Sequence, residues 1–220
     1  MTVLITGANR GIGRALAVAE AQAGGTVIGT HRGAPPSVPG VTWEPLDLTD
    51  PAGPAELARR LGGTAVDLLV CNAGIYPDKG QGLDEGYGAA LWAETFAVNV
   101  TGVFLTVQAL LPHLGRARAP KVAIIASQMG SSERAPGGSY IYRASKAAAI
   151  NLGRNLAVDL APRGIAVGIY HPGWVRTDMG GAGAAIDTDT AVAGLRARFA
   201  QLSLANTGAF LTYDGQPHPF

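Results

Sequence analysis

The stretch TVLITGANRGIGRALAVAEAQA, from Thr2 to Ala23, decides the fold predicted for this chain. It opens with a β-branched and apolar run, passes glycines at Gly7, Gly11 and Gly13, and continues in alanine and leucine. This order predicts a strand, a tight turn and a helix. Glycines there let the backbone approach a phosphate, whose charge the helix N-terminus then meets. A turn that needs glycine only for its backbone angles has the same sequence, so the rest of the chain must decide between the two.

Strands and helices continue to alternate outward from this unit. Further strands are expected at residues 26–31, 41–46, 65–71, 121–127, 165–170 and 208–211. Helices are expected at 51–61, 91–114, 138–162 and 187–201, with an interruption of the second one around 99–102. Such alternation predicts a parallel sheet, because right-handed crossovers place helices on both of its faces. We therefore expect one α/β domain over residues 1–220, a Rossmann-like, doubly wound parallel sheet of about seven strands. The connection Gly33 to Gly40 holds three prolines and cannot form a crossover helix, so the sheet should be thinly covered there.

Composition excludes several classes of partner. The chain has 220 residues, 17 basic and 16 acidic, and a net charge of +1, which favours neither nucleic acid nor a charged membrane surface. Its single cysteine, Cys71, lies in an apolar run and is expected to be buried and unreactive. The N-terminus leads directly into a strand, and no apolar run reaches the roughly 20 residues of a membrane span. The sequence thus predicts a cytoplasmic protein. The four histidines are scattered, which predicts no metal site, and His113 is expected on the surface.

The helix expected at GSYIYRASKAAAINLGRNLAVDLAP, from Gly138 to Pro162, carries a pair of reactive side chains. Tyr142 and Lys146 are four residues apart and share one helix face. A nearby ammonium stabilises a phenolate and is expected to bring the pKa of the phenol toward neutrality, where a proton donor works well. Tyr140 is a rival, but it precedes Lys146 by six residues and lies on another face. A pair of this kind also arises by chance, so its context matters.

That context is a common position just after the strands. The groups that follow predicted strands are Gly7, His31-Arg32, Asp47, Asn72, Ser127 and Pro172-Gly173. The carboxyl ends of parallel strands meet at one edge of the sheet, where α/β proteins bind their ligands. We expect these groups to line one cleft.

The ordered motifs of the chain resemble those of the short-chain dehydrogenase/reductase family. They are Thr6-Gly7-x-x-x-Gly11-Ile-Gly13, Asn72-Ala-Gly74, Asn99, Ser127, Tyr142-x-x-x-Lys146 and Pro172-Gly173. The resemblance covers about residues 2 to 179, and the tail 208–215 is similar to the ending of the family's compact carbonyl-reductase branch. It implies a nicotinamide cofactor and hydride transfer to or from the carbonyl carbon of a small carbonyl or alcohol substrate.

The resemblance also implies a role for each catalytic residue. Tyr142 protonates the substrate oxygen, and Lys146 lowers the pKa of this phenol and binds the nicotinamide ribose. Ser127 holds the carbonyl oxygen, and Asn99 holds a water that links Lys146 to solvent. Ser131, Ser132 and Ser139 are rivals of Ser127, which is preferred because it closes a strand and begins the S-x-x-G pattern that ends at Gly130.

The cofactor expected from the resemblance is NADP(H). The implied contacts are Gly7, Asn9, Arg10, Gly11, Ile12, Gly13, His31, Arg32, Asp47, Leu48, Asn72, Ala73, Gly74, Tyr142, Lys146, Pro172, Val175 and Thr177. An acid after the second strand normally binds the ribose hydroxyls of NAD, whereas this chain has Thr30-His31-Arg32. Arg32, with Arg10 pointing toward the same region, can hold a 2′-phosphate. Arg32 as a solvated loop residue is the alternative.

Substrate size and assembly follow from two further segments. Asp178 to Ile186 is short and rich in glycine and alanine, so it offers little cover and predicts an open site for small to medium aldehydes and ketones. The helices 91–114 and 142–160 are apolar, which predicts a homodimer or a tetramer.

Two other functions stay open: an NAD-dependent alcohol dehydrogenase, and a cofactor-binding signalling or regulatory protein.

Overall fold

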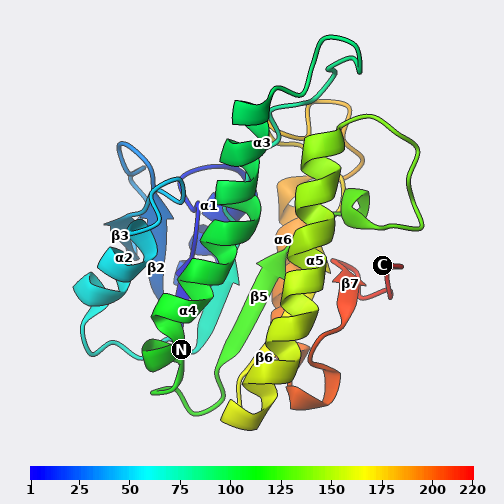
Figure 1. Cartoon of the computed structure of the whole chain (residues 1–220). Helices are drawn as coiled ribbons and strands as arrows, with labels where there is room; N and C mark the ends of the chain where they lie inside the picture. Colours follow the sequence, from blue (N-terminus) through cyan, green and yellow to red (C-terminus); the bar gives the residue numbers. More distant parts are fainter.

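The seven strands of this computed structural model, which describes residues 1–220, form one parallel sheet with helices on both sides (Figure 1). The strands are β1 (Thr2–Ile5), β2 (Thr26–His31), β3 (Val41–Pro45), β4 (Leu68–Cys71), β5 (Lys121–Ile125), β6 (Ala166–His171) and β7 (Phe210–Thr212). The α-helices are α1 (Gly11–Gln22), α2 (Gly53–Leu61), α3 (Ala89–Phe96), α4 (Gly102–Leu114), α5 (Tyr140–Leu160) and α6 (Thr188–Gln201). The predicted fold class is confirmed; the strand ends differ by a few residues, and β4 begins at Leu68 rather than at Ala65.

The order of the strands creates the ligand-binding edge. It is β3-β2-β1-β4-β5-β6-β7, and every neighbouring pair is parallel. The chain moves outward from β1 to β3 and then returns to place β4 on the other side of β1. At that reversal the loops after β1 and β4 lead away from each other, which leaves a crevice at the carboxyl ends of the strands.

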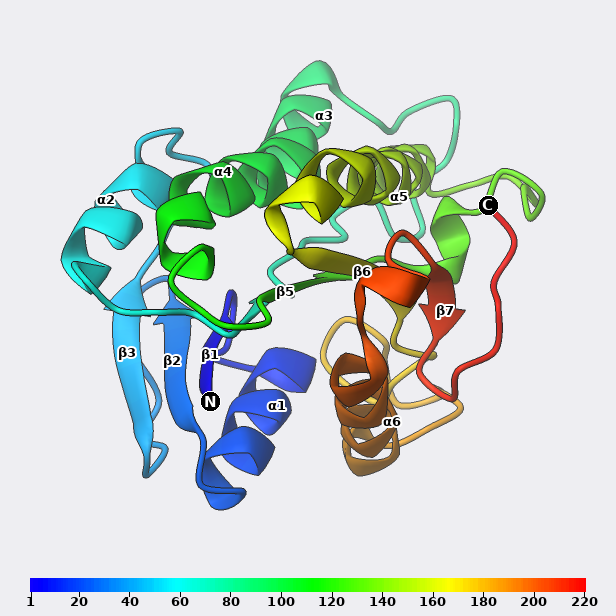
Figure 2. The ribbon, with the colours of Figure 1, turned by 90° about the horizontal axis from the view of Figure 1, so that it is seen from below.

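Alternation along each strand builds two cores. In β1, Leu4 packs with α2, α4 and α5, whereas Val3 and Ile5 face α1 and α6. Figure 2 shows these two layers, with α2, α3, α4 and α5 on one side of the sheet and α1 and α6 on the other. The alternation of strand side chains thus gives each face of the sheet its own apolar layer.

The edge of the sheet at β3 lacks a crossover helix, as the prolines of the preceding connection predict. The segment from Gly33 to Gly40 contains no helix, and β3 is only partly buried. Val41 and Trp43 add apolar surface there, against the α1 side of the sheet. This side of the binding edge is therefore more open than the side near α5.

The helical run from Ala89 to Leu114 is long and apolar enough to cross a membrane, judged by length and composition alone. In the structure it packs on the sheet, with Leu110 and Leu114 fully buried in the core. Core helices of globular domains meet the same criterion. A π-helix over Ala97–Thr101 separates α3 from α4, where the sequence predicts an interruption at 99–102.

Candidate active site

The glycine turn after β1 forms one wall of the cleft at the sheet edge. Gly7 has φ +64°, and a Cβ on it would lie 2.9 Å from the Cα atom of Ala73. A Cβ on Gly13 would collide with the Asn72 amide nitrogen and with the carbonyl oxygen of Gly7. The Asn72 amide donates to the carbonyl oxygens of Thr6 (3.0 Å) and Gly7 (3.1 Å). The glycines are therefore required by close packing against the end of β4.

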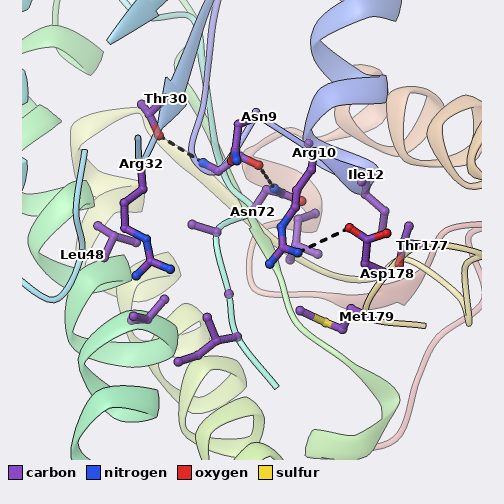
Figure 3. Close-up of a pocket in the computed structure, with 18 of the residues that line it drawn as sticks. Asn9, Arg10, Ile12, Thr30, Arg32, Leu48, Asn72, Thr177, Asp178 and Met179 are labelled. Atoms are coloured by element: carbon purple, nitrogen blue, oxygen red, sulfur yellow. Dashed lines mark hydrogen bonds and ion pairs between the residues drawn. The ribbon is translucent and has the colours of Figure 1, made fainter. Parts of the chain in front are cut away.

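This turn leaves the beginning of α1 free to receive an anion. The residue before the helix, Arg10, is extended, and its side chain does not cap the first N–H groups. Gly11, Ile12 and Gly13 from the first turn line a cleft of about 380 Å³ that extends to Tyr142 and Lys146 (Figure 3). Uncapped N–H groups and the helix dipole match the pyrophosphate of a dinucleotide.

The far end of the cleft, which we call the adenosine end, is polar. His31 ends β2 and Arg32 follows it, and Asp47 and Leu48 follow β3. Hydrogen bonds from the backbone and side chain of Thr49, at 2.9 and 2.8 Å, lower the pKa of Asp47, and the Arg32 charge lowers it further. No carboxylate stands at the end of β2, so this end presents a cation where a ribose-binding acid would otherwise lie.

Arg10 differs from its predicted orientation. Its guanidinium lies 3.4 Å from the Asp178 carboxylate, and both side chains are largely exposed. Figure 3 shows Arg10 turned toward Asp178, while Arg32 lies on the other side of the cleft. The expectation that Arg10 points to the same region as Arg32 is wrong in this structure, because Asp178 offers it a partner.

The other end of the cleft, the catalytic end, is built on α5. The Lys146 ammonium lies 5.7 Å from the centroid of the Tyr142 ring, and these side chains belong to residues that are only 5% and 7% exposed. Tyr140 is 40% exposed and packs edge-on against Tyr87. The structure thus places Tyr142, and not Tyr140, beside the lysine.

Burial controls the titration of this pair. It raises the pKa of Tyr142 to about 12; interaction with the Ser127 hydroxyl lowers the pKa, and Tyr76 and Asp78 raise it. Burial also lowers the pKa of Lys146 to about 8. The expectation that Lys146 brings the pKa of the phenol toward neutrality is wrong here. The ammonium donates to the carbonyl oxygen of Ile125 at 2.9 Å, and loss of hydration outweighs its effect on the phenol.

The loop that follows β5 carries Ser127 and packs closely against α5. The Ser127 oxygen accepts from the N–H of Met129 at 3.2 Å and starts a 3₁₀-helix over Gln128–Gly130. A Cβ on Gly130 would lie 2.6 Å from the backbone carbon of Lys146, so only glycine allows this approach. The rival serines lie elsewhere: Ser131 donates to the Phe220 carbonyl oxygen, Ser139 bonds to Tyr76, and Ser132 is exposed.

Asn99 has no amide hydrogen left for a water. Its Nδ2 donates to the carbonyl oxygen of Ile75 (2.9 Å) and to Ser145 Oγ (3.0 Å), and its Oδ1 accepts from the Ile75 N–H at 2.8 Å. Ser145 in turn donates to the Tyr142 carbonyl oxygen. The side chain therefore connects the loop after β4 to α5, and the water-holding role that the resemblance implies stays a prediction.

All of the predicted cofactor contacts except Val175 line the cleft. Val175 is buried and bridges to Ile186, outside the cleft. Eight further residues line the cleft and are not among the predicted contacts: Thr30, Leu46, Ile75, Val98, Ile125, Ala126, Asp178 and Met179. Most adjoin a predicted motif, and position beside that motif is the only signal they offer in the sequence.

Comparison with known proteins agrees with this geometry. Residues 1–185 match the family model described as short chain dehydrogenase. The chain belongs to the short-chain dehydrogenase/reductase family. It is therefore an oxidoreductase of a family that uses nicotinamide cofactors. The family resemblance that the motifs indicate is confirmed.

Three similar proteins span most of the chain. The C-signal protein of Myxococcus xanthus is 36% identical over 159 residues, covering 70% of this chain and 93% of its own length. The 1-hydroxy-2-glutathionyl-2-methyl-3-butene dehydrogenase of Rhodococcus sp. AD45 is 33% identical, covering 97% of each chain. The NADPH-bound carbonyl reductase from chicken fatty liver superposes with a TM-score of 0.89 and 31% identity, covering 100% of this chain and 98% of the other.

Proposed function

We propose that this oxidoreductase is an NADPH-dependent carbonyl reductase that reduces small to medium aldehydes or ketones to alcohols. The observation that carries the proposal is the buried Tyr142, which keeps its proton at neutral pH and lines the same cleft as the glycine turn and Lys146. A general acid on a rigid helix is required for reduction of a carbonyl, because negative charge develops on its oxygen. The single domain would carry both the cofactor and the substrate site.

The residues of the cleft fit a nicotinamide dinucleotide. The uncapped start of α1 would hold the pyrophosphate, and Arg32 would bind a 2′-phosphate. Lys146 would bind the nicotinamide ribose, with Pro172 and Thr177 beside the nicotinamide. When bound, the reduced cofactor supplies the hydride that the substrate carbon accepts.

Tyr142 and Ser127 would act on the substrate oxygen. Ser127 Oγ donates a hydrogen bond to that oxygen, and Tyr142 transfers its phenolic proton to it as the carbon receives the hydride. The C=O double bond would become a C–O single bond, with a new C–H bond from the hydride and a new O–H bond from the Tyr142 proton. Lys146, whose pKa is near 8, can return a proton to the phenolate at neutral pH. Asn99 would hold α5 and the loop after β4 in register.

The test of the function is turnover of a panel of aldehydes and ketones with NADPH and with NADH. We expect NADPH oxidation with several carbonyls, and slower NADH oxidation. Faster oxidation of alcohols with NAD would instead support a dehydrogenase. Binding of NADPH without turnover of any carbonyl or alcohol would favour a signalling role, the alternative suggested by the similarity to the C-signal protein.

Self-association would use the outer faces of α4 and α5. Phe104 on α4 is 39% exposed and Val158 on α5 is 73% exposed. Large exposed apolar side chains on neighbouring helices favour a symmetric contact between copies. Light scattering should give a dimer or a tetramer, and Val158→Lys should shift it toward the monomer. Leu83→Lys, on an exposed loop, is the matched control. A monomeric mass for the unaltered protein at micromolar concentration contradicts this proposal.

We also propose that the enzyme acts in the cytoplasm.

A further inference from the structure

The loop after β4 holds the start of α5 through three side chains. Asp78 Oδ2 accepts from the backbone N–H of Ile141 at 2.9 Å and of Tyr142 at 3.3 Å. Tyr76 OH and the Ser139 hydroxyl are 2.6 Å apart, and Tyr87 OH accepts from the N–H of Ser139 at 3.2 Å. We call Tyr76, Asp78 and Tyr87 the brace. The contacts of the brace with the start of α5 all fall on the four residues that end with Tyr142.

These contacts replace an ordinary helix cap. Ser139 precedes α5, but it has φ +48° and its side chain does not bond to the first turn of the helix. Non-glycine residues adopt that conformation at an energetic cost, and functional sites are where such strain is retained. The cap comes instead from Asp78, 63 residues earlier in the chain and completely buried. The position of Tyr142 thus depends on a remote carboxylate.

The brace also shapes the surroundings of the phenol. The rings of Tyr76 and Tyr142 stack, with centroids 4.1 Å apart and planes inclined by 21°. This stack excludes water from one face of the Tyr142 ring. Asp78 Oδ1 is buried and has no hydrogen-bond partner, so that half of the carboxylate is not neutralised by a nearby donor.

We propose that Asp78, supported by Tyr76, is a positioning residue that holds Tyr142 in the cleft as a proton donor and keeps it from losing its proton prematurely. A negative charge close to a phenol disfavours the phenolate, and the helix cap fixes where the phenol points. Asp78 and Tyr76 both act in the direction that raises the pKa of Tyr142, beyond the larger effect of burial. The other groups facing Tyr142 are Lys146, a cation, and the Ser127 hydroxyl, which acts in the opposite direction. The catalytic consequence rests on the proposed function; the effect on the phenol does not.

The test is Asp78→Asn, which keeps an acceptor oxygen for the Ile141 N–H and removes the charge. Tyrosine rings labelled with ¹³C at Cζ report each phenol by NMR, and the spectrum of Tyr142→Phe identifies the Tyr142 signal. We expect Asp78→Asn to lower the pH at which Tyr142 begins to ionise by about half a unit or more. The pH profile of kcat/KM for carbonyl reduction should shift in the same direction. Asp84→Asn, an exposed carboxylate in the same loop, should shift neither.

Each result decides the proposal. Ionisation of Tyr142 at the same pH in Asp78→Asn, Asp84→Asn and the unaltered protein overturns it. If Asp78→Asn does not fold, Tyr76→Leu replaces it; this variant keeps the cap and removes the stacked ring, and it should also lower the pH of ionisation and reduce kcat. An unchanged phenol in Tyr76→Leu then overturns the proposal. A protein that reduces no carbonyl removes the proposed function, while the NMR measurement still tests the brace.

Discussion

The catalytic end and the adenosine end of the cleft lie on the same edge of one sheet and differ in physical character. Tyr142 and Lys146 are almost completely buried, and burial dominates the pKa of each. At the adenosine end, Arg32 lies in an exposed loop and acts through its charge. Across the cleft from Arg32, Arg10 and Asp178 form an ion pair, with side chains that are 65% and 80% exposed. Desolvation shifts a pKa by several units, whereas exposed charges are screened by water and salt. Changes at the catalytic end should therefore have the larger effects.

Tyr142→Phe tests the catalytic end most severely. It keeps the ring that stacks on Tyr76 and removes the phenolic proton. We expect kcat for carbonyl reduction to fall on the order of a hundredfold or more, because general acid catalysis is lost. The Kd of NADPH, measured by fluorescence titration, should change little. A variant that retains near-normal turnover removes Tyr142 from the mechanism. Tyr140→Phe, the exposed neighbour, is the matched control.

Lys146→Met tests whether burial of the ammonium costs stability. In the folded protein the pKa of Lys146 is about 8, below its usual value of 10.5, so above pH 8 the unfolded state holds the extra proton. The unfolding free energy of the natural protein should therefore rise between pH 8 and pH 10 relative to the variant, by about 2 to 3 kcal/mol. Urea unfolding of both proteins at pH 7 and pH 10 measures this difference. Lys79→Met, on an exposed loop, should show no such trend.

Arg32→Ala tests the adenosine end. A charge-assisted contact to a 2′-phosphate contributes roughly 1.5–3 kcal/mol, so the preference for NADPH over NADH should fall about ten- to hundredfold. The measurement is kcat/KM with both cofactors, and NADH should be almost unaffected. Arg59→Ala, an exposed arginine on α2 away from the cleft, serves as the control. Equal kcat/KM values for NADPH and NADH in the natural protein would indicate that Arg32 is a solvated loop residue and does not bind the cofactor.

The same contrast explains what the sequence could predict. The glycine turn, the seven strands and the pair Tyr142 and Lys146 follow from periodicity and short motifs, because local spacing determines them. The direction of the Tyr142 pKa shift depends on burial by residues distant in the chain, which spacing does not reveal.

Two other residues show the same limit. Asp78 caps α5 from a remote glycine-rich loop, and nothing in its local sequence marks it as a cap. His113 follows a proline near a helix end and was expected on the surface, but it is buried and bonds to the carbonyl oxygen of Thr64. Contacts between distant segments are what the sequence alone leaves undetermined.

Asp178→Asn should have the smallest effect of these variants, because it changes only an exposed ion pair beside the cleft. The ion pair of Arg10 and Asp178, at 3.4 Å, lies on one side of the cleft, and an exposed pair of this kind contributes about 0.2–1 kcal/mol. The variant frees Arg10 and removes a negative charge near the phosphates of a bound cofactor. We expect the Kd of NADPH to decrease by no more than about fivefold at low salt, because 1 kcal/mol corresponds to about that factor. At 0.5 M salt the difference should nearly vanish, since screening weakens both charges. Asp189→Asn, an exposed carboxylate on α6, controls for net charge. A tenfold or larger change that persists in high salt would show that this pair behaves like the buried groups at the catalytic end, and that the division of the cleft into a buried half and an exposed half is wrong.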